Sequence, residues 1–142
     1  MAKLRHIAMQ VPDLEKAAKF YETVFEMERV AHGNTPFGNA LMLSDGVINM
    51  ALLHFPDGTQ GQINGADWAG LHHIGFVVDD EEETAKVIEE NGGEYFTKLP
   101  EGIPGLQAET KYKDPNGLVF DISAHGWSTS PRKKEPRKKE KV

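Results

Sequence analysis

Cysteine is absent from this chain of 142 residues. Its absence excludes disulfide bonds, thiolate metal sites and cysteine nucleophiles. Any metal site in the protein must therefore use nitrogen and oxygen ligands, and histidine imidazoles and carboxylates are the side chains that supply them.

Long apolar segments are also absent. The chain has no run of about 18 apolar residues, which a membrane span requires, and it has no basic-then-apolar signal segment at its amino terminus. We therefore expect a cytoplasmic protein with no membrane partner. Hydrophobic residues make up 39% of the chain and charged residues 27%, which is typical of a globular domain.

Positive charge is scarce outside the carboxyl-terminal tail. Residues 131–142 contain seven Lys or Arg and two Glu, a net charge of +5, whereas residues 1–130 contain nine basic and twenty acidic side chains, a net charge of -11. The tail has no apolar periodicity, so we predict a folded domain over 1–130 and a disordered basic tail over 131–142. The acidic body argues against nucleic acid as the main ligand.

The chain repeats itself at an interval of 67 residues. Residues 4–13 align without a gap on residues 71–80, and His6 falls on His73. Each copy opens with a strand pattern that leads into a helix pattern. An internal repeat of this size predicts two half-length units, each of which covers apolar surface of the other.

Both units are predicted to have the order β-α-β-β-β. The expected boundaries are a first unit over about 3–53, a connection over 54–70 and a second unit over about 71–127. In the first unit we expect a strand over 3–11, a helix over 16–24 capped by Asp13, a second strand from about residue 25, a loop over 32–38 and a hairpin over 40–53. In the second unit we expect a helix ending near residue 91, a strand over 94–97, a loop over 99–106 and a hairpin over 108–123.

Three motifs resemble the vicinal oxygen chelate superfamily, which includes glyoxalase I, extradiol dioxygenases, methylmalonyl-CoA epimerases and bleomycin resistance proteins. They are His6-Ile7-Ala8 with Val11-Pro12-Asp13, then His72-His73-Ile74-Gly75-Phe76, and then Asp114-Pro115-Asn116-Gly117 with Phe120-Asp121-Ile122. The resemblance covers about residues 3–125. It implies an α+β fold in which two tandem βαβββ modules form a curled mixed sheet around a metal-binding cup, and it implies a homodimer.

The expected metal ligands are His6, His73 and Asp121. The two histidines have the same phase in the two opening strands, so a pseudo-twofold axis would bring them together. The resemblance places Asp121 where the family has a carboxylate ligand, usually Glu. Two imidazoles and one carboxylate with open positions suit Fe(II), and also Mn, Ni or Zn. Alternation along the strand predicts that His72 points away from the cup.

Three further residues are catalytic candidates. Alignment of the two hairpins makes Asn49 the counterpart of Asp121 in the first module, and its lack of charge disfavours a glyoxalase I assignment. Alternation from Asp121 places His125 on the metal side as a candidate acid or base. Tyr112 is a candidate substrate contact on the preceding strand, as are Glu109 and Lys111, which share a face. Residues 100–105 are a candidate lid.

These residues predict a divalent-metal-dependent enzyme that acts on a small oxygenated substrate by bidentate chelation to the metal. The three-ligand set favours a dioxygenase-like reaction. One alternative is an isomerase or epimerase similar to lactoylglutathione lyase. The other is a metal-free, drug-sequestering protein of the bleomycin resistance type, a class that lacks the ligand histidines.

Overall fold

The computed structural model describes residues 1–35, 38–57, 59, 61–99 and 109–131. The candidate lid at 100–105 and residues 132–142 of the predicted tail lie outside this part of the chain. The described residues form an eight-stranded mixed sheet with the order β2-β3-β4-β1-β5-β8-β7-β6. The elements are β1 (Lys3–Gln10), α1 (Leu14–Phe25), β2 (Glu28–Thr35), β3 (Gly38–Ser44), β4 (Asn49–His54), β5 (Gly70–Val77), α2 (Glu81–Glu90), β6 (Glu94–Lys98), β7 (Thr110–Lys113) and β8 (Val119–Ser123).

The first module, β1 to β4, is built around α1. The side chain of Asp13 caps this helix by accepting a hydrogen bond of 3.1 Å from the backbone N–H of Lys16. Leucines of β3 and β4 pack against α1 and form a buried core. The predicted loop at 32–38 is wrong over residues 32–35, because these residues extend β2 and pair with β3. Ladder hydrogen bonds therefore override the loop tendency of Gly and Asn here.

The second module, β5 to β8, repeats this plan around α2. Asp80 caps the helix, and the helix ends where the backbone N–H of Gly93 bonds to the carbonyl of Ile88. Apolar side chains of β7 and β8 pack under α2. Among the described residues, neither helix is long and apolar enough to cross a membrane.

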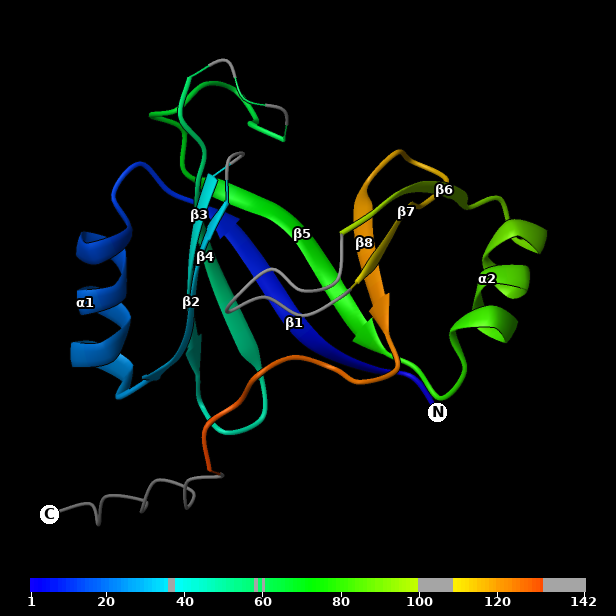
Figure 1. Cartoon of the computed structure of the whole chain (residues 1–142), viewed down its shortest axis with the longest axis horizontal. Coiled ribbons are helices and arrows are strands. Elements are labelled where there is room, and N and C mark those ends of the chain that lie inside the picture. Colours follow the sequence, from blue (N-terminus) through cyan, green and yellow to red (C-terminus); the bar gives the residue numbers. More distant parts are fainter. Residues whose placement is uncertain (36–37, 58, 60, 100–108, 132–142) are drawn as a thin grey trace, which may run out of the picture.

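The two modules join at the centre of the sheet, where β1 and β5 run antiparallel. On either side of this junction β1 pairs with β4 and β5 pairs with β8, both in parallel. Figure 1 shows α1 and α2 on the outer sides of the two ends of the curled sheet, so the faces of the two modules that the helices do not cover are turned toward each other. The predicted α+β fold with a curled mixed sheet is confirmed.

The junction carries a β-bulge in each opening strand. Arg5 is the extra residue of β1, because Leu4 pairs with Phe76 while His6 pairs with Gly75. His72 is the extra residue of β5. The two bulges occupy equivalent places in the repeat, each one residue before a candidate ligand, and a bulge redirects the side chains beside it.

Candidate metal centre

Three predicted ligands from both modules meet at the junction. The Nε2 atoms of His6 and His73 lie 3.2 Å apart. The Oδ2 atom of Asp121 lies 3.0 Å from Nε2 of His73 and 3.8 Å from Nε2 of His6. All three side chains are buried, and together they form a group that could hold a metal ion.

The spacing of these three atoms is compatible with all three binding the same metal ion. Ligand atoms about 2.1 Å from one metal lie about 3.0 Å apart at an angle of 90° and about 3.4 Å apart at the tetrahedral angle. The separations of 3.0, 3.2 and 3.8 Å bracket these values. An ion could therefore be bound by small side-chain adjustments, without movement of the strands.

Asn49 fixes the protonation of His6. Its Nδ2 donates to the carbonyl of Ser128 over 2.8 Å, so its Oδ1 is the atom that faces Nδ1 of His6, also at 2.8 Å. An amide oxygen only accepts, and Nδ1 of His6 must therefore carry the proton. The other ring nitrogen, Nε2, then presents a lone pair to the centre.

His72 fixes His73 in the same way. Nε2 of His72 lies 2.6 Å from the carbonyl of Gly61, so it must donate and carry the proton. Nδ1 of His72 is then an acceptor, and it lies 2.7 Å from Nδ1 of His73, which donates to it. Nε2 of His73 is consequently unprotonated. The expectation that His72 points away was wrong, because the bulge turns its ring toward His73.

The atoms that meet at the centre are therefore all hydrogen-bond acceptors. Two imidazole lone pairs and a carboxylate oxygen face one another, and Oδ2 of Asp121 is the buried side-chain atom with no hydrogen-bond partner among the described residues. Buried polar atoms are normally paired, because an unpaired one costs free energy. The donor chemistry of the cluster therefore fits a cation.

One cation is already adjacent, the ammonium of Lys111. Its Nζ lies 2.8 Å from Oδ1 of Asp121 and 3.1 Å from Oε1 of Glu109. Oε2 of Glu109 accepts a 2.8 Å hydrogen bond from the indole N–H of Trp127, whose ring stacks on His6 at 4.6 Å. These contacts connect His6 to Asp121 through the side chains of Trp127, Glu109 and Lys111.

Burial sets the charge of the imidazoles. Desolvation lowers the pKa of His6 below its usual 6.5, although Glu109 and Asp121 act in the opposite direction. Desolvation, with help from Lys111 and His6, lowers the pKa of His73 further. Desolvation alone would lower the pKa of Lys111, but the two carboxylates outweigh it and raise that pKa. The neutral form of the histidines is the form that binds a metal.

A cavity of about 140 Å³ opens beside the cluster. Its polar wall contains His6, His73, Glu109 and Lys111, and the remaining wall is mostly apolar, with Met42, Ala51, Leu53 and Phe55. Its polar side chains, which also include His72, belong to the cluster or to the hydrogen-bonded residues around it, except Asn39. A substrate in this cavity would therefore place its polar end at the centre.

The first module provides no fourth ligand at the place equivalent to Asp121. In the second module Asp121 pairs with Gly75, and in the first module Ala51 pairs with Ala8, the repeat equivalent of Gly75. The structural counterpart of Asp121 is therefore Ala51, and the predicted alignment with Asn49 was displaced by two residues. A displacement of two residues along β4 keeps the side chain on the same face of the sheet.

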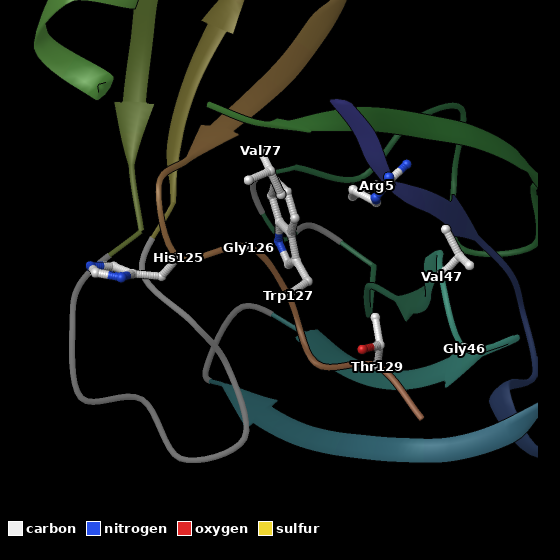
Figure 2. Close-up of a pocket in the computed structure, with 8 residues that line it drawn as sticks. All are labelled: Arg5, Gly46, Val47, Val77, His125, Gly126, Trp127 and Thr129. Atoms are coloured by element: carbon white, nitrogen blue, oxygen red, sulfur yellow. The ribbon is translucent and has the colours of Figure 1, made fainter. Parts of the chain in front are cut away.

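The structure does not bring His125 or Tyr112 to the cluster. The alternation that predicted His125 ends with β8 at Ser123, and Figure 2 shows its exposed ring directed away from Trp127. It lines a separate open pocket of about 460 Å³ that also contains Arg5. That pocket is larger, but no group of metal-ligating atoms converges in it among the described residues. Tyr112 lies on the opposite face of β7 from Lys111, in the core under α2.

Comparisons with solved structures agree with this architecture. A hypothetical protein from Bacillus halodurans C-125 matches with a TM-score of 0.70 and 20% identity, over 95% of this chain and 99% of that chain. Methylmalonyl-CoA epimerase from Mycobacterium tuberculosis matches with a TM-score of 0.67 and 15% identity, over 84% and 85%. The epimerase from Streptomyces coelicolor, in complex with 2-nitronate-propionyl-CoA, has a TM-score of 0.67 and 21% identity, over 84% and 94%.

These likenesses, all under 25% identity, show a shared fold. No curated protein matches the sequence. The family model described as Glyoxalase/Bleomycin resistance protein/Dioxygenase superfamily matches residues 3–122, which span both modules and all three candidate ligands. The chain therefore belongs to the glyoxalase/bleomycin resistance protein/dioxygenase superfamily.

Proposed function

We propose that the protein is a divalent-metal-dependent enzyme of the dioxygenase type, which acts on a small oxygenated substrate. The substrate would bind the metal through one or two neighbouring oxygens. The observation that carries this proposal is the convergence of Nε2 of His6, Nε2 of His73 and the unpaired Oδ2 of Asp121. Two histidines and one carboxylate with open positions are the ligand set of non-haem Fe(II) oxygenases.

The absence of a ligand at Ala51 supports a three-ligand centre. A side chain that ends at Cβ cannot coordinate an ion, so the positions on that side stay available to substrate. Bound at this centre, a divalent ion would supply a Lewis acid for substrate oxygens, and Fe(II) would also supply the redox chemistry that dioxygen requires.

The chain's own side chains would hold and shield the substrate. His72 and Asn49 keep the two imidazoles in the tautomer that binds metal, and second-neighbour contacts of this kind orient ligands. Met42 and Leu53 form part of the apolar wall, which would exclude water from the substrate.

The alternative is an isomerase or epimerase. Glu109 and Lys111 next to the cluster are a carboxylate and an ammonium that could move a proton, and methylmalonyl-CoA epimerases are among the structural neighbours. Both oxygens of Glu109 are already bonded, to Lys111 and to Trp127, which makes it a poor base. We therefore rank proton transfer second. A metal-free drug-binding role ranks third, because it gives the three converging acceptors no partner.

Metal analysis tests the proposal. Protein stripped of metal and reloaded with Fe(II) under anaerobic conditions should hold about one ion per chain. Asp121→Asn and His73→Ala should lose that ion, whereas the exposed control Asp67→Asn should keep it. Equal metal content in all four proteins would refute the metal centre.

Two assays then separate the reactions. The dioxygenase reading expects the Fe(II) protein to consume dioxygen with a catechol or a related enediol. The isomerase reading expects exchange of a substrate C–H with deuterated water in the absence of dioxygen. Exchange of the substrate C–H without uptake of dioxygen would refute the dioxygenase proposal and support the isomerase alternative.

A further inference from the structure

On the basis of the proposed metal-dependent function, we propose that Lys111 binds the substrate directly and that the substrate is a small monoanion. Its charged oxygen would accept a hydrogen bond from the Lys111 ammonium while a neighbouring oxygen binds the metal. Lys111 would therefore be a catalytic residue.

The proposal rests on the third N–H of Lys111. Of its three ammonium hydrogens, one serves Asp121 at 2.8 Å and a second serves Glu109 at 3.1 Å. The nearest further acceptor is Nε2 of His73 at 3.4 Å, which is long for a hydrogen bond. A metal ion would use that lone pair, and the third N–H would then be left for a ligand in the cavity that Lys111 lines.

The ammonium is held in place. Its side chain is 15% exposed, and swinging it away would break both ion pairs. Glu109 is in turn anchored by the indole of Trp127. Lys111 and Asp121 are also paired residues of β7 and β8, so the sheet fixes their separation. A donor fixed in this way recognises a substrate oxygen without paying for its own ordering.

The charge count selects a monoanion. Asp121 and Glu109 contribute two negative charges and Lys111 contributes one positive charge, and a histidine binds a metal in its neutral form. A divalent ion would leave a single positive charge in buried surroundings, and an uncompensated buried charge is unfavourable. One negative charge on the substrate cancels it.

The wall of the cavity favours an apolar remainder of the substrate. The cavity of about 140 Å³ is partly open, and its wall away from the cluster is mostly apolar, with Leu53 and Phe55. The ligand class that fits is a small monoanion with one oxygen for Lys111, a neighbouring oxygen for the metal, and an apolar remainder.

Ligand binding to the Co(II)-loaded protein tests this role without an enzyme assay. Acetohydroxamate, which chelates as a monoanion through two neighbouring oxygens, and neutral imidazole are titrated while the Co(II) absorption is followed. Lys111→Met should weaken acetohydroxamate binding by about tenfold or more, since a charge-assisted hydrogen bond is lost. Imidazole binding should stay within about twofold. Lys113→Met, on the same strand, is the matched control and should bind both ligands like wild type.

The outcomes separate the two proposals. A wild type that binds no Co(II) refutes the metal centre. If wild type and Lys111→Met hold Co(II) and bind acetohydroxamate equally, the metal centre stands and the role of Lys111 falls.

The double variant Glu109→Gln/Lys111→Met removes both partners of one ion pair, so the net charge of the site is the same as in wild type. It also leaves no unpaired Glu109 carboxylate that could cause misfolding. It should still bind acetohydroxamate weakly. Full recovery of binding in this variant would refute direct contact by Lys111.

Discussion

His72 and His73 are adjacent in sequence, yet their imidazoles meet on the same side of β5, with their Nδ1 atoms 2.7 Å apart. The bulge at His72 makes this possible. Through it the carbonyl of Gly61, in the connection between the modules, determines which nitrogen of His73 is free for a metal.

This relationship predicts that His72 controls metal affinity although it is not a ligand. His72→Ala should weaken metal binding by about 10- to 100-fold, because the proton on His73 is no longer directed to Nδ1. Competition with a chromophoric chelator would measure the change. His125→Ala removes an exposed histidine and should leave the affinity unchanged. An equal effect of both substitutions would contradict the role of His72.

Gly75 should not tolerate a methyl group. A Cβ at this position would lie 2.7 Å from the indole of Trp127 and 2.9 Å from Cβ of His6. Gly75→Ala should therefore lower the free energy of unfolding by about 1–3 kcal/mol through overpacking, and it should weaken metal binding by displacing His6.

Urea denaturation would measure the loss of stability. In the background of Trp127→Ala the same substitution should cost much less, because one of the two clashes is gone. Additive effects of the two changes would contradict the contact.

Trp127 should report metal binding. Its ring stacks on His6 at a centroid distance of 4.6 Å, with the planes 5° apart. A paramagnetic ion such as Co(II) bound to His6 should quench its fluorescence in proportion to occupancy.

The chain has a second tryptophan, Trp68, so Trp68→Phe isolates the signal. In that background the quenching should saturate at about one ion per chain. Quenching that survives His6→Ala would place the ion elsewhere.

The metal-free protein should lose stability as the pH falls through 6.5. Both His6 and His73 have a lowered pKa, so below 6.5 the unfolded chain binds protons that the folded chain does not. The free energy of unfolding then decreases with falling pH until the folded-state pKa values are reached, by about 1.4 kcal/mol per histidine for each unit of difference.

Urea midpoints measured between pH 7.5 and 5.5 would show the slope. His73→Phe should reduce it, whereas His125→Ala should not. A slope unchanged by His73→Phe would contradict the prediction.

Much of the fold follows from the 67-residue repeat. Repeated phase placed His6 and His73 on equivalent strands, and equivalent strands meet at the junction of the modules. Alternation also placed Glu109 and Lys111 on one face, and the structure sets both beside Asp121. These features depend on local periodicity, which a sequence displays directly.

Other features depend on pairing between strands. The bulge that turns His72 inward arises from the register of β5 against β1, and the equivalence of Ala51 to Asp121 arises from the register of β4 against β1. The alternation of residues along one strand reveals neither the bulge nor this equivalence, because both depend on how two strands pair. His125 failed for a related reason, since alternation has no meaning after the strand ends at Ser123.

The location of the candidate ligands at the β1–β5 junction has a consequence for the lifetime of the protein. His6 belongs to one half of the chain, and His73 and Asp121 belong to the other. An ion bound by all three would cross-link the two halves of the chain. Its binding free energy would then increase the free energy of unfolding of the whole molecule. Metal starvation would then expose the protein to proteolysis as well as silence it.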